Sequence, residues 1–352
     1  MSRVSPVPTT SQIRKGFEGV FHANVKWRSG RIGLILSCIG LLSPASSFAA
    51  ETKECGLKQV ASLDLVLAGN SYLLVPVTFR ETRAYMALNL ASGLSTVTES
   101  AVSRLSLKPN SIPDNFTAHA EGKAIQKLVT ATPFAMGELR FKSANFWVLP
   151  KHEFRADLAD APVVGVLGSD AFARVDIELD VVHRKLKLFS PDHCPGHAVY
   201  WSAKYDSAPI RIGSLGEFYF PMELDGRNLE TTLSTSNSMT TLHTDATRSL
   251  YNFDNHSPDV QTETDGAGRT TSQYRAMKLS GEGMEIINAR ISLVDFPSDS
   301  DCRLSSHLGA AGYENCEGTH PLSLGQDVIS KLHLYIATKE KMLYFTPADP
   351  TE

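Results

Sequence analysis

Short apolar runs in the first half of the chain follow a pattern that predicts β-strands. Residues 72–79 alternate apolar and polar side chains over their second part, as a half-buried strand does. A polar turn leads to another apolar run at 85–88, and a loop follows at 89–97. Residues 99–107 then predict a short helix that ends before Pro109. The predicted order is therefore strand, turn, strand, loop and helix.

The second half of the chain repeats this order. Residues 218–224 predict a strand, and a polar turn separates them from a second predicted strand at 229–233. A polar loop at 234–242 and a helix at about 245–251 complete the series. A whole unit that recurs in this way is typical of an internal duplication.

A second landmark occurs later in each half. The first half contains Leu167-Gly168-Ser169-Asp170, and the second contains Leu324-Gly325-Gln326-Asp327. In each half this segment precedes two apolar runs that are joined by a polar turn. These predicted strand pairs are residues 175–179 with 185–189, and residues 332–336 with 342–345.

Length and composition favour two folded units. The chain has 352 residues, which suits two domains of ordinary size. Its hydrophobic content of 42% and charged content of 20% allow a sizeable core and argue against a disordered chain. Pro191 and Pro195 interrupt the pattern between the halves. We therefore expect lobe 1 at residues 55–195 and lobe 2 at residues 205–348.

The first 49 residues resemble a targeting segment. Basic residues are scattered between positions 14 and 31, an apolar run follows at 32–42, and residues 47–49 fit a small-x-small cleavage rule. We predict a signal peptide at 1–49 with an extended basic front end. A membrane anchor is the alternative, although the apolar run is shorter than the roughly 20 residues that a spanning helix needs. A lipoprotein attached through Cys38 is a third reading, with a poor match to the lipobox.

The signal segment predicts where the mature protein would be found. An exported chain would be periplasmic or extracellular, without stable membrane insertion after cleavage of the signal. The formal net charge of −4 and the lack of a dense basic stripe argue against a nucleic-acid partner.

Both polar loops resemble the Asp-Thr-Gly-Ala/Ser loop of aspartic peptidases in their position and in their trailing residues, 93–97 and 239–242. A strand, this loop, a helix, a flap hairpin, a Leu-Gly-x-Asp segment and a closing hairpin make up a retropepsin-like aspartic peptidase lobe. The chain resembles two such lobes fused over roughly residues 57–347. The resemblance implies an all-β protein with short helices, in a two-lobed acid-protease-like β-barrel fold of tandem retropepsin-like repeats. It further implies a monomer whose two lobes form an intramolecular pseudo-dimer.

The resemblance places Asn89 and Ser234 where the family has its two catalytic aspartates. Those carboxylates share a proton, because two close like charges cannot both ionise, and both of their catalytic roles need a titratable group. The carboxamide of Asn89 can orient a water but cannot accept its proton at any useful pH. The hydroxyl of Ser234 has no base near it in the sequence. The dyad is therefore expected to be inactive.

The residues beside these two positions differ from the family pattern as well. Leu90 replaces a threonine whose hydroxyl braces the loops, and Ala91 and Ser236 replace glycines that permit close backbone approach. Thr235 is retained. Glycine-containing segments further along each half predict flap tips that could cover a cleft. The candidate cleft-lining residues are Ala91, Ser92, Thr235, Ser236, Gly122 and Gly266.

Without the signal segment the chain has four cysteines: Cys55, Cys194, Cys302 and Cys316. In an exported protein an even number of cysteines predicts disulfides, here two, and four cysteines allow three possible pairings. In a lobe of the implied fold, adjacent first and last strands would bring Cys55 and Cys194 together. Cys302 and Cys316 bracket a glycine-rich segment, which favours a local pairing. The spacing of the last two with His307 and His320 also allows a zinc site, which we rank below the disulfide.

Three other residues could carry chemistry. His243 follows Ser234 by nine positions and could serve as its base, but a histidine at the start of a helix or on the surface is the simpler interpretation. Asp170 and Asp327 occur in both repeats, and we expect them to cap the helices that follow rather than to catalyse.

Three functions stay open at this point. The favoured one is an inactive peptidase homologue that holds an extended peptide or protein segment in the interlobe cleft without cleaving it. The second is a working aspartic endopeptidase, and the third is an interaction protein that uses its outer surface and keeps only a vestigial cleft. None of the three calls for a cofactor or a metal ion.

Overall fold

A computed structural model describes most of the chain outside its two ends and several loops. The described residues are 21–22, 56–69, 72–112, 118–120, 123–150, 154, 160–213, 215–264, 270–295 and 321–348. Apart from residues 21–22, the predicted signal peptide at 1–49 lies outside them, so this segment stays a prediction.

Strands dominate the described residues and the helical segments are short, which confirms the predicted all-β class. The helical segments are α2 (Glu99–Arg104), η1 (Ser169–Phe172), α3 (Thr244–Ala246), η2 (Thr247–Tyr251) and α5 (Gln326–Ile329). Thr98 is the N-cap of helix α2, and its Oγ1 accepts a hydrogen bond from the Ala101 N–H at 3.1 Å. The helix is shorter than the predicted 99–107 because the chain turns at Ser106, where φ is 50°.

The first lobe is built on an 11-stranded sheet with the order β12-β11-β4-β5-β14-β6-β13-β10-β7, to which β1 adds at β13 and β3 adds at β4. A separate hairpin pairs β8 (Ala118–Ala120) with β9 (Lys123–Ile125). The strands of the large sheet are β1 (Phe21–His22), β3 (Val66–Ala68), β4 (Tyr72–Phe79), β5 (Thr82–Asn89), β6 (Thr96–Thr98), β7 (Pro109–Ser111), β10 (Lys127–Ala131), β11 (Phe134–Met136), β12 (Leu139–Phe141), β13 (Ser143–Leu149) and β14 (Val163–Gly168).

The second lobe is built on a 10-stranded sheet with the order β22-β23-β26-β21-β27-β20-β19-β24-β25, to which β18 adds at β19. Its strands are β18 (Arg211–Ile212), β19 (Phe218–Leu224), β20 (Arg227–Leu233), β21 (Thr241–His243), β22 (Val260–Thr264), β23 (Thr270–Arg275), β24 (Lys278–Gly281), β25 (Met284–Ile287), β26 (Arg290–Val294) and β27 (Leu322–Leu324).

The centres of the two lobes repeat the same pairings. In lobe 1, β5 runs parallel to β14, β14 antiparallel to β6, and β6 parallel to β13. In lobe 2, β20, β27, β21 and β26 repeat these three pairings in the same order. The internal repeat expected from the sequence is therefore present in the structure, and the protein has a two-lobed acid-protease-like fold. Its assignment to the retropepsin-like branch stays a prediction.

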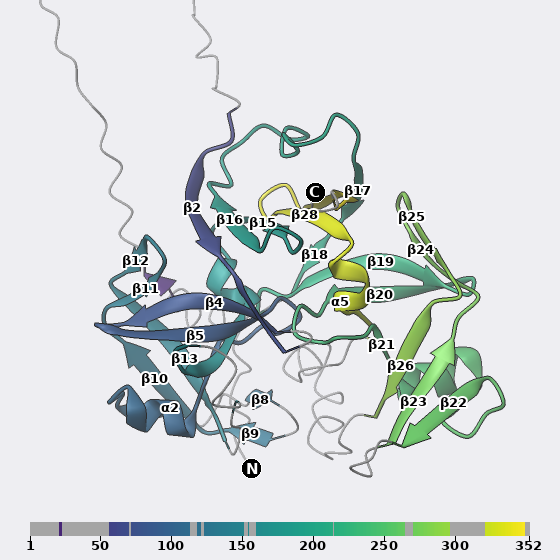
Figure 1. The fold of residues 1–352 in the computed structure, drawn as a ribbon, viewed down its shortest axis with the longest axis horizontal. Helices are drawn as coiled ribbons and strands as arrows, with labels where there is room; N and C mark the ends of the chain where they lie inside the picture. The colour runs from purple at the N-terminus through teal and green to yellow at the C-terminus, as the bar shows by residue number, and fades with distance from the viewer. Residues whose placement is uncertain are drawn as a thin grey trace, which may run out of the picture.

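A six-stranded sheet joins the lobes, with the order β17-β29-β28-β15-β16-β2 (Figure 1). Its central contact is the antiparallel pair β15 and β28, in which Ile177 lies opposite Ile336. The pair β16 and β2 brings together the first and last strands of lobe 1. The six strands are β2 (Gln59–Asp64), β15 (Asp176–Asp180), β16 (Lys185–Phe189), β17 (Asp206–Pro209), β28 (Leu332–Ala337) and β29 (Met342–Pro347).

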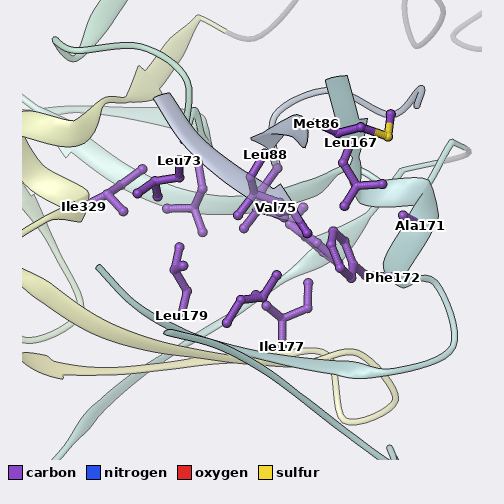
Figure 2. Close-up of a cluster of buried hydrophobic side chains, with 14 of the residues drawn as sticks. Leu73, Val75, Met86, Leu88, Leu167, Ala171, Phe172, Ile177, Leu179 and Ile329 are labelled. Carbon is purple, nitrogen blue, oxygen red and sulfur yellow. The ribbon is translucent and has the colours of Figure 1, made fainter. Parts of the chain in front are cut away.

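One hydrophobic core continues from this shared sheet into both lobes. Ile177 and Leu179 of β15 point from the sheet toward Val75 and Leu88 of lobe 1 (Figure 2). Ile329, from α5 of lobe 2, lies in the same cluster, and all five side chains are fully buried. The shared core fixes the end of β5 relative to lobe 2, and so positions the candidate site.

Candidate functional site

The loops that follow β5 and β20 are joined by one threonine. The fully buried Thr235 donates its hydroxyl hydrogen bond to the Leu88 carbonyl at 2.8 Å, and its Oγ1 accepts from the Leu90 N–H at 3.2 Å. Leu88 and Leu90 flank Asn89, so the second loop holds the first on both sides of that residue. Because Ser234 directly precedes Thr235, Asn89 and Ser234 both lie at this interlobe seam.

Neither seam residue can act as an acid or base at ordinary pH. Asn89 is the last residue of β5 and is half-buried, and its Oδ1 accepts a hydrogen bond from the Ala91 N–H at 3.1 Å. Ser234 is only 3% exposed, and its backbone N–H donates to the Leu324 carbonyl at 2.8 Å. The two positions therefore lack the proton-sharing carboxylates that aspartic peptidase chemistry requires.

The brace between the loops is polar on one side only. Leu90 holds the position in the first loop that Thr235 holds in the second, and it is a hydrocarbon side chain buried in the main core. It cannot donate a hydrogen bond to the backbone beside Ser234. Hydrogen bonding across the seam from these two positions therefore comes from lobe 2, while lobe 1 contributes apolar packing.

Removing the Thr235 hydroxyl should weaken the seam. Thr235→Val keeps the volume but leaves the buried Leu88 carbonyl and Leu90 N–H without this partner, which should lower the free energy of unfolding by about 1–3 kcal/mol. Urea unfolding measures the change. Thr232→Val is a matched control, because the Thr232 hydroxyl is buried with no hydrogen-bond partner among the described residues. A loss as large in Thr232→Val as in Thr235→Val would contradict the assigned role.

Each loop is also held by an aspartate from the Leu-Gly-x-Asp segment. Asp170 accepts hydrogen bonds from the Ser95 N–H at 3.0 Å and the Ser95 hydroxyl at 2.5 Å. In lobe 2, Oδ1 of Asp327 accepts from the Thr240 N–H at 2.8 Å and the Thr240 hydroxyl at 2.9 Å. The two lobes thus use the same device at equivalent places.

The prediction that Asp170 and Asp327 cap the following helices is wrong. The N-cap residues of η1 and α5 are Gly168 and Gly325, and neither helix has a side-chain capping hydrogen bond. Each carboxylate instead binds a residue of the loop, which donates hydrogen bonds from both its N–H and its hydroxyl. The same loop hydroxyls accept the N–H of the two glycines, at 3.0 and 3.1 Å. The aspartates are therefore structural, as expected, but they stabilise the loops.

Of the six predicted cleft-lining residues, the structure describes four and does not describe the other two. Thr235 is fully buried and Ser92 is 5% exposed, with the Ser92 hydroxyl donating to the Leu94 carbonyl at 3.0 Å. Ala91 and Ser236 are half-buried beside them. The predicted flap tips lie outside the described residues, but each falls between paired antiparallel strands, β8 with β9 and β22 with β23; they are Gly122 and Gly266.

The environment of Asp170 predicts a pH-dependent stability. Burial raises the pKa of Asp170 to about 6, against the opposing effect of the hydrogen bonds from Ser95. Because the ordinary value is 3.8, the folded protein holds this proton more tightly than the unfolded chain. The resulting stabilisation is complete below about pH 4 and is lost as the pH rises to about 6. At about 1.4 kcal/mol for each pKa unit, the loss is at most about 3 kcal/mol.

Asp170→Asn has no such titration, so its unfolding free energy should fall less than that of the wild type between pH 4 and 6.5. Urea unfolding at several pH values measures the difference. Asp64→Asn is the control, because the Asp64 side chain is 82% exposed, and it should keep the wild-type profile. Parallel profiles for Asp170→Asn and the wild type would contradict the prediction.

A turn of lobe 2 that the sequence analysis did not single out packs against lobe 1 beside the first loop. Leu215 packs with Leu94 and Trp147 of lobe 1, and Oε2 of the buried Glu217 accepts from the Leu215 N–H at 3.2 Å. A Cβ on Gly93 would lie 2.6 Å from the Leu215 Cβ and 2.5 Å from the Glu217 Cδ. Gly93 is therefore required because the turn leaves no room for a side chain at this position. The glycine in the first loop was the one feature of the sequence that could have indicated this contact.

His243 is the last residue of β21 and directly precedes α3, as expected of a histidine at a helix start. Burial lowers the pKa of His243 to about 4, so the side chain is neutral at neutral pH. Its backbone N–H donates to the Pro321 carbonyl at 2.9 Å.

The proposed disulfides and the zinc alternative fall mostly outside the described residues. Cys194 lies within them, whereas Cys55, Cys302 and Cys316, like His307 and His320, do not. Both pairings therefore stay predictions. In the part of the chain that the structure describes, no group of three or more His, Cys, Asp or Glu residues is placed to hold a metal ion. That part also contains no helix with the length and apolar character needed to span a membrane.

Comparison with known proteins gives similarity in structure only. No family model matches the sequence, and no curated protein matches it. Among solved structures, the fold is similar to the crystal structure of basic 7S globulin from soybean, with 9% sequence identity and a TM-score of 0.45. The similarity covers 84% of this chain and 96% of the soybean chain. Because both values are low, the fold assignment rests on the strand pairings described above.

Proposed function

We propose that this protein is an exported, catalytically inactive homologue of aspartic peptidases that holds an extended peptide or protein segment between its lobes without cleaving it. What supports the proposal is a combination at the seam: Thr235, Asp170 and Asp327 hold the loops, and the residues that the sequence resemblance aligns with the two acids are Asn89 and Ser234. A scaffold that is kept without its acid–base pair favours binding over hydrolysis.

The physical chemistry of the seam is compatible with the loss of both catalytic acids. Two facing carboxylates carry a desolvation and repulsion cost that Asn89 and Ser234 avoid. An extended segment could bind by strand-like hydrogen bonds to the predicted flap hairpins, which is a common mode of peptide recognition. The export that we propose rests on the basic and apolar pattern of residues 1–49.

Two assays test the proposal. Digestion of casein with and without pepstatin should show no pepstatin-sensitive cleavage. Fluorescence anisotropy with a library of labelled extended peptides should show binding without turnover. Ser236→Trp, which places a large ring at the seam, should reduce binding at least roughly tenfold, because a central position carries most of an interface's energy. Ser103→Trp, at an exposed position of α2, is the matched control and should bind as the wild type does.

The opposite results would be equally informative. Pepstatin-sensitive cleavage that survives Asn89→Ala together with Ser234→Ala would show that the catalytic positions lie elsewhere. A protein that binds no peptide in the library, or binds equally well with Ser236→Trp, would overturn the proposed cleft and favour an interaction protein that uses its outer surface.

A further inference from the structure

The β4–β5 hairpin of lobe 1 has a second face that points away from the main core. Met86 of β5 points into that core (Figure 2), and because neighbouring side chains of a strand point to opposite faces, Arg83 and Tyr85 lie on the outer face. In the register of the hairpin, Thr78 of β4 lies opposite Arg83, and Pro76 lies opposite Tyr85. These four side chains are therefore neighbours on the outer face.

A pocket of about 80 Å³ is lined by these four residues. Gly137, in the turn between β11 and β12, and Ala161, in the segment before β14, also line it. The Tyr85 N–H donates to the carbonyl of Pro162 at 2.9 Å, which holds the neighbouring Ala161 beside β5. A single water needs about 10–15 Å³ of such space, so the pocket has room for a molecule of several non-hydrogen atoms.

Two opposite charges act on the Tyr85 hydroxyl at this pocket. Burial raises the pKa of Tyr85, the hydrogen bond with the Asp160 carboxylate raises it further, and the positive charge of Arg83 lowers it. Tyr85 is only 7% exposed, whereas Arg83 and Asp160 are both exposed. Both charged groups therefore lie near one hydroxyl and are open to solvent.

The two charges do not pair with each other. Among the residues that the structure describes, Arg83 forms no ion pair, either with Asp160 or with another carboxylate. The Thr78 hydroxyl likewise forms no hydrogen bond with another described residue. A carboxylate has about four acceptor sites, so Asp160 keeps some free beside its contact with Tyr85. The cation, the hydroxyl and the carboxylate are therefore all available to a bound molecule.

These groups favour a ligand that carries two opposite charges. The planar guanidinium of an arginine pairs best with a carboxylate, which it can bind through two parallel hydrogen bonds. A carboxylate such as that of Asp160 in turn accepts charge-assisted hydrogen bonds from an ammonium group. A ligand with only a carboxylate would be repelled by Asp160, and a ligand with only an ammonium group would be repelled by Arg83. A zwitterion avoids both repulsions.

We propose that this pocket binds a small α-amino acid such as glycine or alanine, with the ligand's carboxylate on Arg83 and its ammonium group on Asp160. The Thr78 hydroxyl supplies a further hydrogen bond, and the volume of the pocket limits the ligand to a small side chain. Arg83 precedes Asn89 by six residues of the extended strand β5, which is roughly 20 Å at about 3.3 Å per residue. The pocket is therefore separate from the seam, and it does not depend on the proposed peptide binding.

Equilibrium dialysis of the full chain against radiolabelled L-alanine tests this site. We expect a dissociation constant of about 1 mM or tighter. Unlabelled glycine should compete about as well as alanine, whereas acetate and methylammonium, which each carry one of the two charges, should compete at least roughly tenfold more weakly. L-Phenylalanine should not compete, because its ring is too large for the pocket. No binding of alanine, or equal competition by acetate, methylammonium or phenylalanine, would overturn the proposal.

Two substitutions test whether alanine binds at these residues. Arg83→Gln and Asp160→Asn should each weaken alanine binding at least roughly tenfold, because each removes a charge-assisted contact. Both side chains are exposed, so neither variant should lose stability, and urea unfolding checks this. Arg174→Gln is the matched control, because Arg174 is an exposed arginine outside the pocket, and it should bind alanine as the wild type does. Unchanged binding in either Arg83→Gln or Asp160→Asn would overturn the assignment.

Discussion

Replacing Gly325 by alanine is expected to lower the free energy of unfolding by about 3 kcal/mol or more, the upper end of what overpacking costs. A Cβ at this position would lie 2.6 Å from the Thr240 nitrogen and closer still to the Met239 carbonyl. These are backbone atoms of the second loop and cannot rotate away. The φ of Gly325 is −95°, which any residue can adopt, so the requirement for glycine is one of space. Urea unfolding measures the loss.

Substitutions at two further glycines give losses of stability with which the Gly325→Ala result can be compared. Gly168→Ala, at the equivalent place in lobe 1, brings the Cβ to 2.8 Å from the Ser92 and Leu94 carbonyls, so a smaller loss of about 1–3 kcal/mol is expected. Gly281→Ala is the control, because the nearest atoms would lie at an ordinary 3.5 Å. If Gly325→Ala were no worse than Gly281→Ala, the close approach of the loop to the Leu-Gly-x-Asp segment would be refuted.

The second large effect is expected from Glu178→Ala. This substitution leaves Lys187, His333 and Tyr200 without the carboxylate that they surround, and breaking a buried ion pair in this way costs about 3–5 kcal/mol. Thermal and urea unfolding should both show the loss.

Glu230→Ala is the matched control for burial. Its carboxylate pairs with Arg211 at 2.8 Å through two hydrogen bonds, but the two side chains are 44% and 50% exposed. An exposed pair contributes about 1 kcal/mol or less, so this variant should be close to the wild type. Similar losses in both variants would show that burial does not set the strength of the Glu178 cluster.

The sequence predicted local elements well where side-chain alternation was clear. Strands β4, β16 and β19 have the predicted bounds, and the repeated order of elements matches the repeated strand pairings. The second predicted helix, at 245–251, divides into α3 and η2. These successes share a cause: periodicity within one segment reports which face of that segment is buried.

Failures occurred where the partner of a side chain was distant along the chain. Asp170 was expected to bind the helix beside it, but it binds Ser95, which is 75 residues away. Glu217 and Leu215 carried no recognisable motif, yet their turn packs on lobe 1. A short-range pattern cannot identify such contacts, because the partner is chosen by how strands pair.

By itself, the sequence determined the two-fold repeat, the all-β class and the residue types Asn89 and Ser234, whose side chains cannot perform acid–base catalysis. Only the tertiary structure decided that Thr235 reaches across to Leu88 and Leu90, and that the acids of β15 are buried beneath the segment between β16 and β17. Alternating acidic and apolar residues on a strand are typical of one solvated face. Here the segment between β16 and β17 covers that face through His193 and Tyr200, so the burial of these acids was decided by long-range packing.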